Sequence, residues 1–125
     1  MKYYSRLRPL TPGTYPEGNI KEIKDYGERI YITDIGYEAW GYIDYDGEIS
    51  DNEARRYDLI SEEYHMYHCV LSCIYEDGQS KSVLREQKIL KKKPIDEYYE
   101  RKNCRLFINW FDDYSKVEAC IKEKK

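Results

Sequence analysis

Two extended runs of residues joined at Asp77-Gly78 constrain the fold of this chain more than any other feature. An Asp-Gly pair readily adopts the positive φ angles that a two-residue hairpin turn requires. Such a turn sets the cross-strand pairs, which are Tyr75 with Ser80, Cys73 with Ser82, and Leu71 with Leu84. The run that begins at His65 is apolar on both faces, which predicts a central strand. The returning run is charged and ends at Lys91-Lys92-Lys93-Pro94, which predicts a sheet edge.

The whole pattern predicts an α+β fold with a mostly antiparallel sheet, one short internal helix and a C-terminal helix. Further extended runs cover residues 2–8, 20–23, 29–35, 37–45 and 98–110. Ser50 and Glu53 form a capping box for a helix that ends near Tyr57. Asp112-Asp113 marks the start of the terminal helix. A chain of 125 residues without an internal repeat fits a single domain over residues 1–125.

Charged residues are abundant and unevenly distributed along the chain. The formal charge of -3 argues against a general nucleic-acid binder, which usually carries an excess of basic residues. Residues 38–63 contain nine acids and two bases, whereas residues 81–93 contain six bases and one acid. This polarity would steer a charged partner, but two solvated surfaces are the simpler explanation, because long charged side chains are seldom buried.

The histidines and cysteines come closest to a site for a metal or a nucleophile. His65, His68, Cys69 and Cys73 are ligand types that zinc prefers, but they lack the paired spacing of zinc sites. On a strand, adjacent residues point to opposite faces, so His68 and Cys69 do not form a catalytic pair. We therefore expect packed cysteines, partly exposed histidines, no metal, no cofactor and no catalytic residue.

The cysteines and the distribution of apolar residues indicate the compartment in which the protein works. Four irregularly spaced cysteines and an N-terminus without an apolar run predict a reducing, cytoplasmic setting. No stretch approaches about twenty apolar residues, so we expect no membrane partner.

Tyrosine is unusually frequent, with 15 tyrosines against two phenylalanines. Its ring has a large rigid apolar face and a polar tip, which suits protein contact surfaces. The tyrosines beside charged residues are candidates for an exposed set, and they are Tyr3, Tyr4, Tyr37, Tyr42, Tyr45, Tyr98 and Tyr99. The alternative is that tyrosine replaces phenylalanine at the boundary of the core.

Three segments resemble a family of small proteins carried by mobile elements and their bacterial hosts. They are MKYYSRLRPLTPGTYP, AWGYIDYDGEIS with YDLI after it, and FINWFDDYSKVEA. The resemblance touches most of the chain and supplies no activity, cofactor or catalytic residue. It implies a setting in which small accessory proteins bind host machinery, including defence systems.

We therefore expect a non-enzymatic protein that binds a larger host protein or nucleoprotein complex. It would inhibit a host defence complex, as anti-CRISPR proteins do, by occluding a nucleic-acid-binding surface. The predicted contacts are an acidic patch of Asp44, Asp46, Glu48 and Asp51 and the aromatic residues Tyr37, Tyr42, Tyr45, Tyr98 and Tyr99. The alternative is nucleic-acid binding by a basic arm of Lys81, Arg85, Lys88, Lys91, Lys92 and Lys93.

Overall fold

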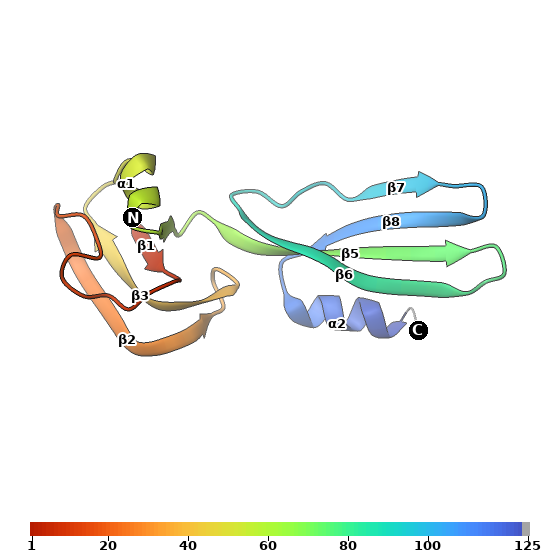
Figure 1. Ribbon diagram of the computed structural model, residues 1–125, viewed down its shortest axis with the longest axis horizontal. Helices are drawn as coiled ribbons and strands as arrows, with labels where there is room; N and C mark the ends of the chain where they lie inside the picture. The colour runs from red at the N-terminus through yellow and green to blue at the C-terminus, as the bar shows by residue number, and fades with distance from the viewer. Residues whose placement is uncertain (124–125) are drawn as a thin grey trace. The chain divides into compact units, whose positions relative to one another are not determined.

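The computed structural model describes residues 1–123 and divides the chain into two compact units, Met1–Tyr64 and His65–Lys125. Within the described residues, each unit contains one four-stranded antiparallel sheet and one helix (Figure 1). The predicted α+β class, with an internal and a C-terminal helix, is therefore confirmed. The strands form two sheets, and the grouping of both units into a single domain stays a prediction.

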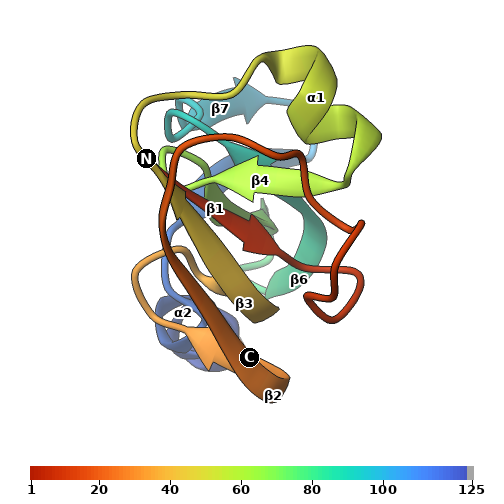
Figure 2. The same cartoon turned by 90° about the vertical axis from the view of Figure 1, so that its left-hand side faces the viewer.

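The first unit has the sheet order β2-β3-β1-β4, with α1 beside β4 (Figure 2). Its elements are β1 (Lys2–Ser5), β2 (Ile20–Ile32), β3 (Tyr37–Tyr45), α1 (Asp51–Arg56) and β4 (Leu59–Ser61). The predicted helix start is confirmed, because the Ser50 hydroxyl accepts a hydrogen bond from the Glu53 backbone N–H at 3.2 Å.

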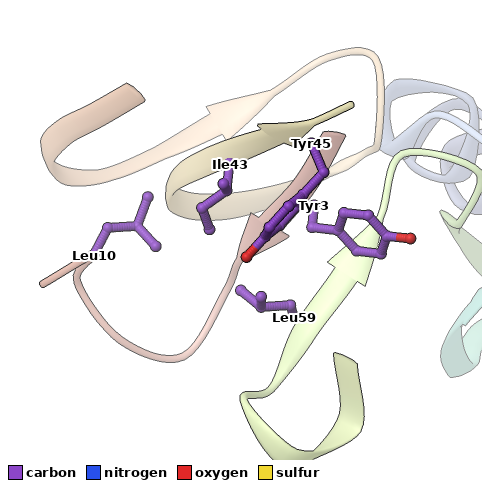
Figure 3. Packing of buried hydrophobic residues seen from close by; sticks show 5 residues of the cluster. All are labelled: Tyr3, Leu10, Ile43, Tyr45 and Leu59. Atoms are coloured by element: carbon purple, nitrogen blue, oxygen red, sulfur yellow. The ribbon is translucent and has the colours of Figure 1, made fainter. Parts of the chain in front are cut away.

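The core of this unit lies on one face of its sheet, as the alternating burial along β3 indicates. One cluster of buried side chains consists of Tyr3, Leu10, Ile43, Tyr45 and Leu59 (Figure 3). Ala54 and Tyr57 pack against this cluster from α1 and its C-terminal end. The face that contains Ile43 is therefore the main packed face of this sheet, although Tyr4 is also buried on the other face.

β2 is one long strand where the sequence pattern predicts two strands separated by a turn at Gly27. The register with β3 shifts between Asp25 and Ile30, and Gly27 has a φ of 74°. The Asp25 carboxylate accepts a hydrogen bond from the Gly27 N–H at 2.9 Å. Glycine at positive φ also forms β-bulges, so the strand continues through this point.

The second unit has the sheet order β6-β5-β8-β7. Its elements are β5 (His65–Tyr75), β6 (Ser80–Leu90), β7 (Glu97–Glu100), β8 (Cys104–Phe111) and α2 (Tyr114–Glu123). β5 is central and β6 lies at an edge, so both predictions for this hairpin are confirmed. The His68 ring meets the Tyr114 ring edge-on at 5.4 Å, which places α2 on the face of the sheet that contains His68.

The pairing within this hairpin differs by one residue from the predicted register. The observed pairs are Ile74 with Ser80, Ser72 with Ser82, and Val70 with Leu84. The Tyr75 N–H donates to the Gln79 carbonyl at 2.8 Å, so the loop has three residues and Gly78 takes a φ of 86°. Three-residue loops also place glycine in the left-handed region, and each added loop residue shifts the register.

The predicted single strand over residues 98–110 is also wrong, because the chain turns back at residues 101–103. The Arg101 N–H donates to the Cys104 carbonyl at 2.8 Å and closes this turn between β7 and β8. The turn contains neither glycine nor proline, so the usual sequence signal is missing.

Candidate functional site

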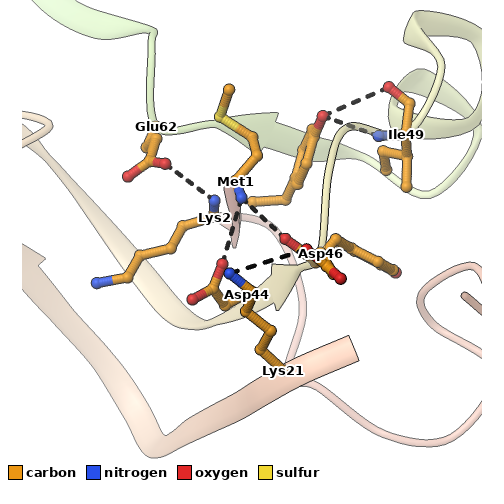
Figure 4. Close-up of polar contacts among 9 residues, drawn as sticks. Met1, Lys2, Lys21, Asp44, Asp46, Ile49 and Glu62 are labelled. Atoms are coloured by element: carbon orange, nitrogen blue, oxygen red, sulfur yellow. Dashed lines mark hydrogen bonds and ion pairs between the residues drawn. The ribbon is translucent and has the colours of Figure 1, made fainter. Parts of the chain in front are cut away.

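The acidic segment of the first unit, defined as Asp46, Glu48 and Asp51, leaves the end of β3 and enters α1. Hydrogen bonds fix the backbone along this segment, and Figure 4 shows those that join Tyr3 and Ile49. The Asp46 N–H donates to the Asn19 carbonyl at 2.6 Å, and the Ile49 N–H donates to the Tyr3 hydroxyl at 3.1 Å. Because the Ser50 cap fixes the next residue, the carboxylates extend from an ordered backbone.

Asp44 and Asp46 are paired with cations. The Met1 ammonium lies 3.3 Å from the Asp44 carboxylate, which is largely shielded from solvent. Lys21 lies 3.9 Å from Asp46, and both of these side chains are exposed. Exposed ion pairs of this length are weak, so the negative charge of Asp46 can still attract a basic partner. The charge of Asp44 is largely neutralised by the Met1 ammonium.

Glu48 and Asp51 are exposed and form no ion pair within residues 1–123. Their field reaches the Tyr3 hydroxyl, whose pKa is raised mainly by burial and further by Glu48, Glu63 and Asp51. Asp51 lies in the first turn of α1, where the helix dipole favours negative charge. Of the four acids in the predicted patch, the three of the acidic segment therefore keep charges that a partner could meet, whereas Asp44 is paired with Met1.

Two of the predicted contact tyrosines are buried and unavailable to a partner. Tyr37 and Tyr45 are only 3% and 2% exposed, and Tyr3 and Tyr4 are also buried. The Tyr45 hydroxyl donates to the Pro16 carbonyl at 2.5 Å, which shows its structural role. The expected exposure of these four rings is wrong, because strand parity places Tyr37 and Tyr45 on the same side as Ile43.

Tyr42 lies on the opposite face of the same sheet and is half-buried. Its hydroxyl donates to the Glu22 carboxylate at 2.6 Å, and the Lys2 ammonium lies 4.7 Å from its ring centre. The hydrogen bond to Glu22, with a smaller effect of burial, raises the pKa of Tyr42 to about 12. A predicted contact residue is thus already engaged by its neighbours.

Tyr98 and Tyr99 are exposed, as expected, but they point to opposite faces of β7. Tyr98 stacks against Phe107 with ring centres 4.9 Å apart, and its hydroxyl donates to Glu100. The Arg101 guanidinium lies 5.3 Å from the ring centre of Tyr99. Only Tyr99 therefore shares a face with Cys69 and Cys73 of β5.

The basic arm follows the edge strand β6 and the segment after it. Lys81 and Lys88 pair with Cys73 and Tyr67 and share their face, whereas Arg85 occupies a bulge. Lys88 lies 3.7 Å from Glu86, and both are at least partly exposed. Lys91, Lys92 and Lys93 line an open groove of about 900 Å³ together with Leu90, Ile95 and Trp110.

His68 and Cys69 are buried and lie on opposite faces of β5. The expectation of partly exposed histidines is wrong for His68, whose Nδ1 is 2.8 Å from the Gln87 amide nitrogen. Burial lowers the pKa of His68 and raises the pKa of the Cys69 thiol. Among residues 1–123, no group of three or more His, Cys, Asp or Glu side chains is placed to hold a metal ion.

The sequence pattern did not single out a group of residues at the end of the second sheet. Tyr75, Arg101, Lys102 and Arg105 contribute to an open pocket of about 430 Å³ near the β5–β6 turn. Tyr75 shares a strand face with Tyr67 and Cys69, and this parity was the available signal. The bases were missed because the predicted continuous strand separated them from the hairpin.

The two units have opposite formal charges. The first unit contains eight basic and fourteen acidic side chains, which gives a charge of -6. The second contains thirteen basic and ten acidic side chains, which gives +3.

No helix among residues 1–123 is long and apolar enough to cross a membrane.

Comparison with known proteins gives one family match and no individual relative. The search of curated proteins and the search of solved structures both found no match. A family model described as "Defence against restriction A C-terminal" matches residues 1–63. The matched region ends one residue before the boundary of the first unit. The chain, half of which is covered by this match, therefore belongs to the Defence against restriction A C-terminal family.

Proposed function

We propose that this protein counters a host restriction system by binding a restriction complex, without catalysing a reaction. Family membership supports the link to restriction, and the observation that carries the proposed mechanism is the ordered acidic segment. This segment lies within the part of the chain that matches the family model. The sequence alone led us to expect inhibition of a host defence complex of the kind that anti-CRISPR proteins block. We propose restriction machinery as the target instead.

The proposed mechanism is electrostatic occlusion of a DNA-binding surface. Surfaces that bind DNA neutralise phosphates with lysine and arginine side chains. Asp46, Glu48 and Asp51 would occupy such a surface and compete with phosphate for its cations. A fixed backbone lowers the entropy lost on binding. The charge of -6 on the first unit accelerates association with a basic partner.

Restriction of unmodified DNA in living cells tests this function. Restricting and non-restricting host strains that express the protein would be challenged with unmodified phage. We expect the wild-type chain to raise phage survival only in the restricting strain. The variant Glu48→Lys/Asp51→Lys should lose this protection, because it reverses the two acids that lack an ion pair among the described residues.

The matched control is Glu17→Lys/Glu28→Lys, which makes the same change in net charge at two exposed positions outside the acidic segment. This control should protect as well as wild type. Equal protection by both variants would reject the acidic segment as the contact. Absence of protection by the folded wild-type chain against the restriction systems tested would reject the proposed function for those systems.

A further inference from the structure

The second unit presents a sheet face that α2 does not cover. We call it the helix-free face, because α2 packs on the opposite face beside His68. Its half-buried or exposed members include Tyr67, Leu71, Cys73, Tyr75, Leu106 and Tyr99. The family match ends before this unit begins, so the match gives this face no role.

One row across this face combines an aromatic ring, an apolar floor and a cation. Strand pairing aligns Tyr99 with Leu106, Leu106 with Cys73, and Cys73 with Lys81. Four neighbouring strands span about 14 Å from first to last at the usual strand spacing. The Arg101 guanidinium beside Tyr99 gives the row a second cation at its aromatic end.

A second exposed ring extends the platform along the strands. Tyr75 is 43% exposed and Tyr99 is 38% exposed. Tyr75 pairs with Cys104, which is two residues along β8 from the partner of Tyr99. Arg101 and Lys102 line the pocket beside Tyr75 together with Glu76 and Glu100, whereas Arg105 pairs with Ile74 and lies on the opposite face. Two exposed rings therefore lie near cations on a face that also carries apolar and acidic side chains.

We infer that the helix-free face binds single-stranded nucleic acid, with bases on Tyr75 and Tyr99 and phosphates near Lys81 and Arg101. Base–aromatic stacking beside a positively charged groove is the usual arrangement of proteins that bind single strands. A duplex keeps its base faces stacked inside, so exposed rings on a sheet favour unpaired bases.

Acidic residues on this face weaken the electrostatic attraction that we expect between it and nucleic acid. Glu86 shares the face and lies 3.7 Å from Lys88, and Glu97 shares it beside Ile108. Their charges reduce the attraction for phosphate, whereas Lys81 forms no ion pair within residues 1–123. Stacking should therefore contribute more to affinity than charge, and the salt dependence should be shallow.

Fluorescence anisotropy of the full chain with a labelled oligothymidine of about twelve nucleotides tests this inference. A duplex of equal length and an oligouridine serve as the comparison probes. We expect tighter binding of the single strands than of the duplex. Tyr75→Ala and Tyr99→Ala should each weaken single-strand binding about fivefold or more. Lys81→Gln should lower the slope of log affinity against log salt by about 0.7.

The matched controls are Tyr31→Ala and Lys24→Gln, which alter exposed β2 residues in the acidic first unit. They should bind like wild type, and Tyr99→Phe should keep the affinity because the ring remains. Circular dichroism checks that each variant is folded. The inference is overturned by no single-strand binding at low salt, by preference for the duplex, or by wild-type affinity in both tyrosine-to-alanine variants. It does not depend on the restriction assay, since its variants lie in the other unit.

Discussion

Tyrosine ionisation is the chemistry most strongly altered at the scale of single residues. Burial raises the pKa of Tyr4 and of Tyr45 to about 12, compared with an ordinary value of 10. The folded state therefore holds these protons more tightly than the unfolded state. The stability that this contributes is present below pH 10 and is lost as the pH rises toward 12.

We predict that the free energy of unfolding falls steeply between pH 10 and 12. Urea denaturation at stepped pH values measures it. Tyr45→Phe should flatten this fall because it removes one of the buried ionisations. Tyr31→Phe, at an exposed position, is the control. An equal slope in wild type and Tyr45→Phe would contradict the assignment.

Tyr42 differs because a carboxylate, and not burial, is the main cause of its raised pKa. We predict that Glu22→Gln lowers the pKa of Tyr42, because ionisation would no longer place two anions side by side. Ultraviolet titration of tyrosinate measures the change, and Tyr42→Phe identifies the transition. An unchanged titration curve in Glu22→Gln would refute the role of this hydrogen bond.

Gly41 is fixed by close packing between neighbouring backbones. A Cβ atom there would lie 2.1 Å from the Lys24 carbonyl oxygen and 2.9 Å from the Leu10 side chain. We predict that Gly41→Ala lowers the free energy of unfolding by about 1–3 kcal/mol, because backbone must move to admit the methyl group. Gly18→Ala, which meets only the Tyr45 ring at 3.4 Å, should cost less, and chemical denaturation compares the two. Equal stability of the two variants would contradict this reading.

At the scale of elements, the cap of α1 fixes the acidic segment. We predict that Ser50→Ala destabilises the protein by about 1 kcal/mol, because the Glu53 N–H loses its acceptor. Ser50→Asp should retain most of the stability, since a carboxylate also accepts this hydrogen bond. Thermal unfolding followed by circular dichroism measures both. A Ser50→Asp variant as unstable as Ser50→Ala would argue against the cap.

The elements also show how far the sequence determines the structure. Alternation identified β3, apolar residues on both faces identified the central position of β5, and the Ser50 box identified α1, because these signals are local. The register of β5 with β6 was missed, since Asp77-Gly78 fits both a two-residue and a three-residue loop. The turn before Cys104 has no glycine or proline, so only long-range pairing reveals it.

The same limits apply to the candidate site. The sequence singled out the acidic residues as a patch, but it could not show that the Met1 ammonium lies beside Asp44. Tyr37 and Tyr45 were assigned to a contact surface by their charged neighbours, although their parity with Ile43 places them in the core. Burial depends on which faces pack together, and neighbours in sequence do not specify this.

At the scale of the whole molecule, charge separates the two units. The family match covers the acidic unit and ends before the basic one. In our proposals the first unit contacts a restriction complex and the second contacts single-stranded nucleic acid. Each proposal has its own variants, so one can fail while the other stands.

Competition between this protein and DNA for a purified host restriction complex tests whether the acidic segment occludes a DNA-binding surface. Increasing amounts of the chain would be added to the complex bound to labelled, unmodified DNA. We predict that wild type and Glu17→Lys/Glu28→Lys release the DNA, whereas Glu48→Lys/Asp51→Lys does not. Simultaneous binding of the chain and the DNA to one complex would contradict occlusion by the acidic segment.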